Sequence, residues 1–200
     1  MRLTSLIISG LLTVASAHPL YTVVKRDAAS IVAALKNVQT NVQTLNATVN
    51  TFNKGDLDGL IKVLKIQKQT SAVGDSVVTA ASTAQQSEVL NEADTQKVAE
   101  GVLALKADLD TFLPNLSSKK PAFDSVAFLF SVSKTVAQSL QTQKQQSANL
   151  GDAITAKLTG PLAGFAPLIN AQIAEQFDKA IAVFQQQGGL IPLPPIPSFG

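Results

Sequence analysis

Apolar residues recur at alternating steps of four and three through much of the chain that follows residue 26. The clearest series begins at Ile31 and continues through Leu35, Val38, Val42, Leu45, Val49 and Phe52. This spacing places all of these side chains on one face of an α-helix. Gly55 suits the left-handed conformation that commonly closes a helix. We therefore predict a first helix that ends near residues 54–56.

Two further helices follow from the same periodicity. The second runs from about Leu57 to Ala84, and its first turns are apolar through Leu57, Leu60, Ile61 and Leu64. The third covers residues 90–113, with Asn91 as its N-cap and Pro114 as the residue that closes it. Both are expected to be amphipathic, with one face turned towards a shared core.

The remaining apolar series predicts two more helices. Pro121 is well placed to open a fourth helix, because the first turn of a helix does not need the missing N–H. This helix reaches Leu158, with a bend expected near Gly151. A fifth helix spans Leu162 to Phe184, with Pro167 in its uncertain first turn.

The predicted fold class is all-α: an antiparallel bundle of about five amphipathic helices without disulfides. No Asn-Gly or Asp-Gly hairpin turn lies between alternating apolar runs, and the sequence has no cysteine. The helical domain is expected to cover residues 27–187. Residues 188–200, GGLIPLPPIPSFG, form a Pro-rich segment that is expected to be a flexible, extended tail.

The first 26 residues have the pattern of an export and processing region. Residues 1–17 combine a basic start, a short apolar stretch and a small-residue cleavage pattern that ends at Ala17. The stretch is shorter than the ~20 residues that span a bilayer, so we predict a signal peptide and no transmembrane segment. Residues 18–26 resemble a propeptide that is cleaved after Arg26. Two alternatives remain: the basic pair Lys25-Arg26 is not cleaved, or residues 1–17 form an ordinary buried first helix instead of a signal peptide.

Cleavage after Arg26 would restrict the chemistry of the mature chain. The sequence has 16 basic residues, of which three precede residue 27, and 14 acidic residues that all follow residue 26. The remaining 13 lysines give a formal net charge of −1, and the only His and the only Tyr are removed. Nucleic-acid binding is not expected without a basic face. We expect no catalytic residue, no metal site and no cofactor, because no imidazole or thiol remains.

Two close acidic pairs and two sequons are the remaining local signals. Asp56 with Asp58, and Asp108 with Asp110, are better explained as helix-end or solvated charges than as a catalytic or calcium site. Asn46 and Asn115 each begin a sequon. We favour Asn115 as the glycosylated residue, because it is expected to lie between two helices.

Two polar stretches, residues 67–71 and 141–147, interrupt the long second and fourth helices. They either face each other across an incompletely filled interior or form solvated faces. The first alternative predicts head-group contacts from Gln67, Ser71 and Ser147. The apolar lining would then come from Leu64, Leu105, Leu109, Phe112, Phe123, Phe130, Phe165, Ile169 and Phe177. Ordinary core packing is the alternative role for the phenylalanines.

Three segments resemble the fungal hydrophobic surface-binding protein A family, which includes cell-wall galactomannoproteins. They are GLIKVLKIQKQT (59–70), LNEADTQKVAEGVLAL (90–105) and SSKKPAFDSVAF (117–128), of which residues 119–124 are the most telling. The resemblance covers roughly residues 27–187. It implies a secreted or wall-associated helical domain that adsorbs to hydrophobic surfaces or encloses fatty acids. Secreted esterases or cell-wall polysaccharide are the further partners that it implies.

We therefore expect a secreted, non-enzymatic protein that binds hydrophobic surfaces or lipids through the apolar interior of a helical bundle. The extracellular space, with the cell wall as a further location, is the expected compartment. The alternative is a structural or antigenic glycosylated wall mannoprotein without a specific ligand. The sequence lacks the long Ser/Thr-rich tail and the anchor signal of anchored wall members, which weakens a covalent wall role.

Overall fold

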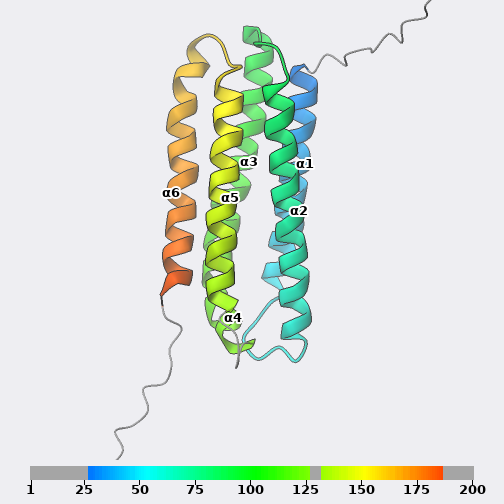
Figure 1. Ribbon diagram of the computed structural model, residues 1–200, viewed down its shortest axis with the longest axis vertical. Coiled ribbons are helices and arrows are strands. Elements are labelled where there is room, and N and C mark those ends of the chain that lie inside the picture. Colours follow the sequence, from blue (N-terminus) through cyan, green and yellow to red (C-terminus); the bar gives the residue numbers. More distant parts are fainter. Residues whose placement is uncertain (1–26, 127–131, 187–200) are drawn as a thin grey trace, which may run out of the picture.

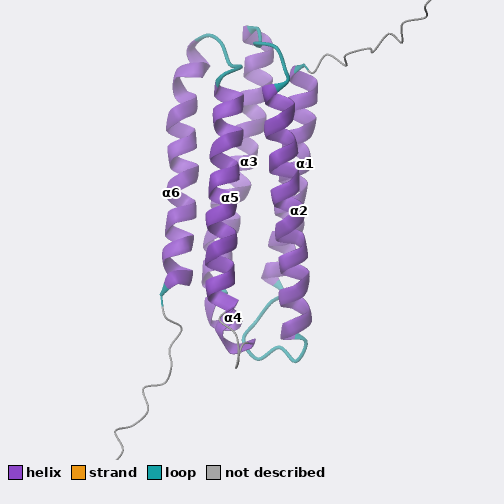
Figure 2. Ribbon diagram, viewed as in Figure 1, coloured by secondary structure: helices purple, strands orange, loops and turns teal. Residues whose placement is uncertain are grey.

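The computed structural model describes residues 27–126 and 132–186, and its regular elements are all helical (Figure 1, Figure 2). Within these residues no strand is formed, which confirms the predicted fold class. The elements in chain order are α1 (Ala28–Asn50), α2 (Gly59–Gln85), α3 (Glu92–Ser118), α4 (Lys120–Val126), α5 (Val132–Thr155), the 3-10 turn η1 (Pro161–Phe165) and α6 (Ala166–Gln185).

The five long helices form a closed ring rather than a layered stack. α1 lies between α2 and α3, α2 packs on α5, α5 packs on α6, and α6 returns to α3. Each long helix runs opposite to the long helix before it in the sequence (Figure 1). The ring order differs from the chain order, however, so three neighbouring pairs are parallel: α1 with α3, α2 with α5, and α3 with α6. This arrangement surrounds a central space on all sides.

Local sequence signals start two of these helices. The carboxylate of Asp27 accepts a hydrogen bond from the backbone N–H of Ser30 at 3.0 Å, which caps α1. Asn91 caps α3 in the same way, through the N–H of Asp94, which confirms the predicted N-cap. The predicted end of the first helix at residues 54–56 is wrong, because α1 ends at Asn50 with Thr51 as its C-cap. Gly55 does adopt the left-handed conformation, with a φ of +88°, but it lies in the loop that follows the helix.

An aromatic cluster lies at the end of the ring that carries α4, which is the lower end in Figure 1. Phe123 of the short helix α4 lies between Phe52 and Phe184, with ring centroids 4.8 Å and 5.6 Å apart and edge-to-face geometry. All three rings are completely buried. Because Phe52 follows α1, Phe123 belongs to α4 and Phe184 lies near the end of α6, the cluster connects segments that are far apart in the sequence.

Pro114 does not end the third helix, so this sequence prediction is wrong. α3 continues through Pro114 to Ser118, and the side chains of Leu113 and Leu116 are buried beyond or beside the proline. A proline within a helix costs about 3 kcal/mol, because it removes one backbone hydrogen bond and crowds the preceding turn. Burial of the two leucines offsets this cost.

The predicted fourth helix corresponds to two separate elements, α4 and α5, which lie on either side of residues 127–131. α5 continues through Gly151 to Thr155 and ends before Leu158. The fifth predicted helix is divided into η1 and α6, with Pro167 in the first turn of α6. Pro167 is tolerated there, because its missing N–H would have no partner inside the helix.

The apolar residues at the start of α2 do not join the core. Leu57, Leu60, Ile61 and Leu64 are all exposed, although the sequence pattern predicted an inward-facing stripe. Val63 and Ile66 form the inward face of these turns instead. Among the helices of the described ranges, none combines the length and apolar character that crossing a bilayer requires.

Candidate functional site

An apolar cavity of about 390 Å³ occupies the centre of the helical ring. All five long helices contribute to its wall, and Phe123 of α4 closes one end. Ligand pockets in proteins commonly measure about 300–1,000 Å³. The cavity is therefore large enough to be a binding site rather than a packing defect.

The wall formed by α1 and α3 is entirely apolar. α1 contributes Leu35, Val38, Val42 and Leu45 from the periodic series that forms its buried face. α3 contributes Ala99, Val102, Leu103, Leu105, Leu109, Phe112 and Leu116. Because neither helix offers a hydrogen-bonding side chain to the cavity, this wall can only make hydrophobic and dispersion contacts.

The opposite wall carries a polar stripe. On α5, Thr135, Ser139, Gln143 and Ser147 follow one another at intervals of four residues and all line the cavity. Gln67 and Thr70 face them from α2. The side chain of Gln143 donates a hydrogen bond from Nε2 to the backbone oxygen of Thr70 at 3.1 Å. The two polar stretches of the sequence therefore lie beside each other, at the parallel α2–α5 contact.

Two glycines allow α5 to approach its neighbours closely. A Cβ atom at Gly74 of α2 would lie 2.8 Å from Nε2 of Gln143, and one at Gly151 of α5 would lie 2.5 Å from Oδ1 of Asn170. The Nδ2 of Asn170, on α6, also donates a hydrogen bond to the hydroxyl oxygen of Thr155 at 3.4 Å. Small residues at these points bring polar side chains to the cavity edge.

The cavity reaches the surface where its lining residues are also exposed. Gln67 and Thr135 are exposed lining residues at the α2–α5 side. Leu103, Leu162 and Phe165 are exposed lining residues where α3 approaches η1 and α6. The lining contains no ionisable side chain among the described residues, so its electrostatic character comes only from amides and hydroxyls.

Most of the described residues that were predicted as lining surround this cavity. The apolar ones are Leu105, Leu109, Phe112, Phe123, Phe165, Ile169 and Phe177, and the polar ones are Gln67 and Ser147. Their contact with a ligand stays a prediction. Phe130 and the processing residues Ala17 and Arg26 lie outside the described residues.

Leu64 and Ser71 do not lie among the residues that line the cavity, so the structure does not place them as predicted. Leu64 is exposed on the outer face of α2, next to the cavity-lining Val63. The Ser71 hydroxyl donates to the backbone oxygen of Gln67 at 3.3 Å, one turn earlier on the same helix. A helix turns about 100° for each residue, which separates these positions from their lining neighbours.

Sequence reasoning missed much of the polar stripe and the whole contribution of α1. Thr135, Ser139, Gln143 and Asn170 line the cavity but were not selected as head-group contacts. The four-residue spacing of small and polar residues on α5 is a signal that was available in the sequence. The α1 series was interpreted as core only, since periodicity does not distinguish a filled interior from a hollow one.

The position predicted for Asn115 is wrong, because this residue lies within α3 and not between helices. Its Nδ2 donates to Oδ1 of Asn46 on α1 at 2.7 Å. The two sequon asparagines are therefore hydrogen-bonded to each other where α1 and α3 meet. Glycan occupancy at either asparagine stays a prediction.

Comparison with known proteins relates this chain to helical lipid-binding domains. A family model described as hydrophobic surface binding protein A matches residues 28–156. The crystal structure of AFMP4P in complex with palmitic acid has a TM-score of 0.73 and 28% sequence identity, and the match covers 79% of this chain and 99% of that chain. No curated protein sequence gives a significant match.

Ligand-binding domains of the MP1 protein of Penicillium marneffei share the fold. Domain 1, complexed with arachidonic acids, has a TM-score of 0.66 and 18% identity, and the match covers 76% of this chain and 94% of that chain. Domain 2, complexed with multiple arachidonic acids, has a TM-score of 0.70 and 18% identity, with 82% and 99% covered. At this identity the likeness establishes the fold alone.

Proposed function

Because the chain belongs to the hydrophobic surface binding protein A family, we propose that it holds a long-chain fatty acid, or a similar single-chain lipid, inside the helical ring. The observation that carries this proposal is the central cavity, with its apolar wall on α1 and α3. The structure of AFMP4P with palmitic acid, which has the same fold, supports the choice of ligand class.

Hydrophobic transfer provides the driving force for this function. Each methylene group that moves from water into an apolar environment gains about 0.8 kcal/mol. A chain of many methylenes can therefore bind tightly without a covalent bond and without an ion pair. The function needs no reaction, so we propose a non-enzymatic carrier or binder.

The polar stripe is the proposed site of the lipid head group. Gln67 and Thr135 lie at the α2–α5 edge of the cavity, where a carboxyl or hydroxyl group can remain in contact with water. Gln143 and Ser147 offer an amide and a hydroxyl further along the same stripe. The acyl chain then lies along α1 and α3, where only apolar side chains are present.

We propose that this binding takes place outside the cell. The signal peptide at residues 1–17, the propeptide at residues 18–26 and the tail at residues 188–200 are sequence predictions in parts of the chain that the structure does not describe. Association with the cell wall, or with secreted esterases at a hydrophobic substrate, is a further part of the proposal. Both follow from the family resemblance alone.

Titration of the delipidated protein with a fluorescent fatty acid tests the proposal. We expect saturable binding that palmitic acid displaces. Val136 of α5 lines the cavity and is partly buried, so Val136→Trp fills space that the chain would occupy. Overpacking of this kind costs about 1–3 kcal/mol in a full site, which corresponds to an affinity loss of roughly tenfold or more.

Val89→Trp is the matched control, because Val89 is exposed and does not line the cavity. This variant is expected to bind the probe as the original chain does. Circular dichroism reports whether Val136→Trp remains helical. Binding that is absent from the original chain, or unchanged in a folded Val136→Trp protein, contradicts a ligand site in this cavity.

A further inference from the structure

The first turns of α2 present an apolar patch to solvent that the central cavity does not use. Leu60, Ile61 and Leu64 are 64%, 68% and 57% exposed, and Leu57 in the preceding loop is fully exposed. Leu60, Ile61 and Leu64 lie on one face of the helix because they are three and four residues apart. We call these three side chains, together with Leu57 of the preceding loop, the α2 patch. A contiguous apolar patch of this kind commonly marks an interaction surface.

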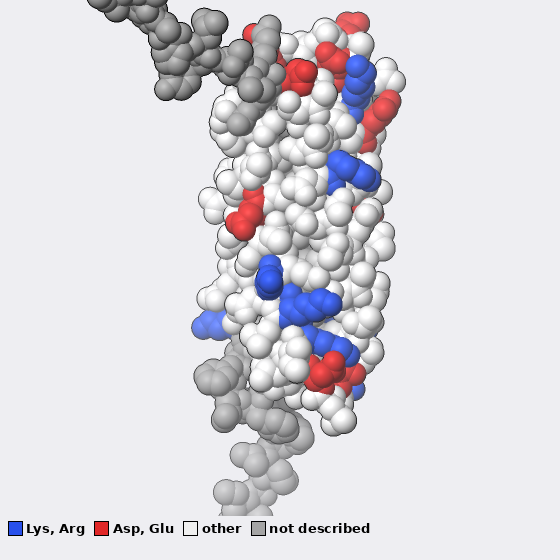
Figure 3. All heavy atoms as spheres, turned by 90° about the vertical axis from the view of Figure 1, so that its right-hand side faces the viewer, with Lys and Arg blue, Asp and Glu red and all other residues white. Residues whose placement is uncertain are grey.

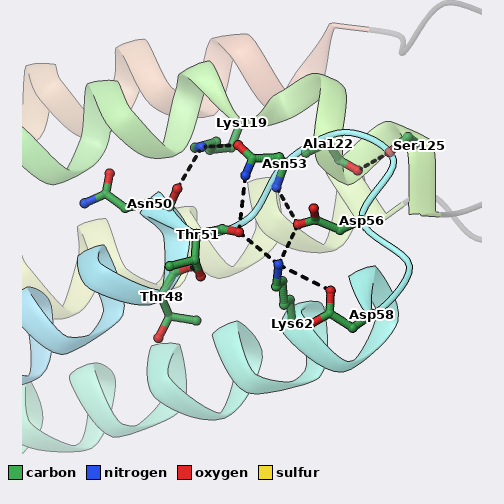
Figure 4. Close-up of polar contacts among 10 residues, drawn as sticks. All are labelled: Thr48, Asn50, Thr51, Asn53, Asp56, Asp58, Lys62, Lys119, Ala122 and Ser125. Carbon is green, nitrogen blue, oxygen red and sulfur yellow. Dashed lines mark hydrogen bonds and ion pairs between the residues drawn. The ribbon is translucent and has the colours of Figure 1, made fainter.

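A network of polar contacts fixes the loop that presents Leu57 (Figure 4). The ammonium group of Lys62 donates to Asp56 at 2.7 Å and to the backbone oxygen of Thr51 at 3.0 Å, and it pairs with Asp58 at 3.3 Å. The backbone N–H of Asn53 donates to Asp56 at 2.8 Å.

Lys119 joins this network from the end of α3. Its ammonium group donates to the backbone oxygen of Asn50 at 3.1 Å and to Oδ1 of Asn53 at 3.0 Å (Figure 4). Two lysines from different helices thus hold one loop. Because this loop is ordered by its polar groups, Leu57 stays exposed without having to pack against the core.

Lysine side chains continue the patch along the same helix face. Lys65 and Lys68 lie four residues after Ile61 and Leu64, and neither is paired with a carboxylate among the described residues. Residues 54–68 contain four lysines and two aspartates, which gives a formal charge of +2. Figure 3 shows that lysines gather in the lower half of the side of the molecule that carries α1 and α2.

We propose that the α2 patch, together with Lys65 and Lys68, docks the folded protein on an anionic lipid surface. Apolar side chains beside lysines on a helix are typical of segments that lie at a membrane interface. Leu57, Leu60, Ile61 and Leu64 enter the acyl boundary, while the lysines extend to the level of the negative head groups. The bundle does not open in this mode of binding.

Charge complementarity favours an anionic lipid over the other occupants of such a patch. A second copy of the chain, paired about a two-fold axis, would bring like-charged lysines together, which is unfavourable. An uncharged solid surface would bind the leucines but leave the lysines without a role. Anionic head groups satisfy both parts of the surface.

The position of the patch relates docking to the cavity. Val63, Ile66 and Gln67 lie on the inner face of the same turns and line the cavity, whose α2–α5 edge is exposed at Gln67. A lipid surface bound by the outer face of α2 is therefore one helix away from the ligand site. This link to lipid loading depends on the proposed function, whereas docking itself does not.

Sedimentation with vesicles tests the docking. Vesicles of phosphatidylcholine, with and without phosphatidylglycerol, are mixed with the folded protein at low ionic strength. We expect binding mainly to the anionic vesicles, and weaker binding as salt is added. The double variant Leu60→Ser/Ile61→Ser should bind about tenfold more weakly or worse. Lys65→Gln/Lys68→Gln should also lose roughly tenfold or more, on anionic vesicles only.

Matched controls come from other exposed positions. Leu168 on α6 is 56% exposed and does not line the cavity, and Lys179 on the same helix is a surface lysine. Leu168→Ser and Lys179→Gln should bind vesicles as the original chain does. Circular dichroism confirms that each variant is folded.

Three results overturn the docking proposal. One is a patch variant that binds vesicles normally, and another is equal binding of the original chain to neutral and anionic vesicles. The third is self-association in sedimentation velocity without lipid that the patch variants abolish. Fatty-acid titration of the same variants in solution is expected to be unchanged. Vesicle docking without fatty-acid binding would contradict the proposed function and leave the docking intact.

Discussion

α1 and the first turns of α2 have similar apolar spacing but opposite environments. The periodic residues of α1, from Ile31 to Phe52, are all buried in the core. The apolar residues Leu57, Leu60, Ile61 and Leu64, in the next loop and the first turns of α2, are all exposed. The difference arises because α1 is flanked by both α2 and α3, whereas this part of α2 turns its other face to the interior.

This contrast shows that periodicity identifies a helix and its stripe but not what covers the stripe. A helix can carry two apolar faces, and only the assembled ring decides which one is buried. In the first turns of α2 the inner face is formed by Val63 and Ile66, and the outer face is free to serve a different purpose. The predictions below test this difference, from the largest expected effect to the smallest.

Two isoleucines provide a matched pair for stability. Ile31→Ala in α1 removes a fully buried side chain and should lower the free energy of unfolding by about 2–5 kcal/mol. Ile61→Ala in α2 removes a side chain that is 68% exposed and should change it by less than about 0.5 kcal/mol. Urea denaturation monitored by circular dichroism measures both. Equal losses would show that the two faces are not different.

Neighbouring residues of α2 provide a matched pair for binding. Val63 lines the cavity, whereas Leu64 lies on the outer face. Val63→Phe should weaken fatty-acid binding by roughly tenfold, because the larger ring occupies space needed by the acyl chain. Leu64→Phe should leave the affinity unchanged. Titration with a fluorescent fatty acid compares them, and a larger effect at Leu64 would reverse the assignment of the two faces.

Acid should loosen the loop between the two helices, whereas the buried apolar face of α1, which has no titrating group, should not respond. The hydrogen bond from Lys62, and then that from the backbone of Asn53, lower the pKa of Asp56 below its ordinary value of 3.8. The charged carboxylate therefore stabilises the folded loop above pH 3.8, and this contribution is lost as the pH falls through the lowered pKa. The effect on global stability should be small, because the carboxylate is only partly buried and solvent screens its charge.

The amide resonance of Asn53 reports this change by NMR. It should shift as Asp56 is protonated, while amides in the middle of α1 stay constant over the same range. Asp56→Asn removes the titrating group, so the acid-dependent shift at Asn53 should disappear. A shift that persists in this variant would assign the titration to another group.

Most of the helical fold could be predicted from the sequence, because local periodicity and capping residues agree with the tertiary structure. Asn91 caps α3 as the sequence predicted, whereas α1 ends at Asn50, before the predicted closing residue Gly55. Pro114 shows the limit of local rules, since burial of Leu113 and Leu116 outweighs the local cost of a proline in α3. The ring order of the helices was not predictable, because it depends on contacts between distant segments.

The candidate site could be predicted only in part for a related reason. The polar stretches of the second and fourth predicted helices correctly indicated polar groups near an interior, but only some of their members face it. Ser71 and Leu64 do not line the cavity, whereas Gln143 and Thr70 line it side by side at the α2–α5 contact. Neighbouring residues of a helix point about 100° apart, so a shift of one residue decides whether a side chain lines the cavity. A single sequence does not determine this rotation of the helix.

A cavity wall with amides and hydroxyls, and with no ionisable group among the described lining residues, limits the selectivity of the proposed carrier. A carboxylate that enters deeply loses its hydration and meets no counter-ion, so it either stays at the rim or takes up a proton. An alcohol or an ester with the same hydrocarbon tail meets the same surroundings. Discrimination would then rest on the length and width of the tail, and one protein could serve a whole class of waxy compounds.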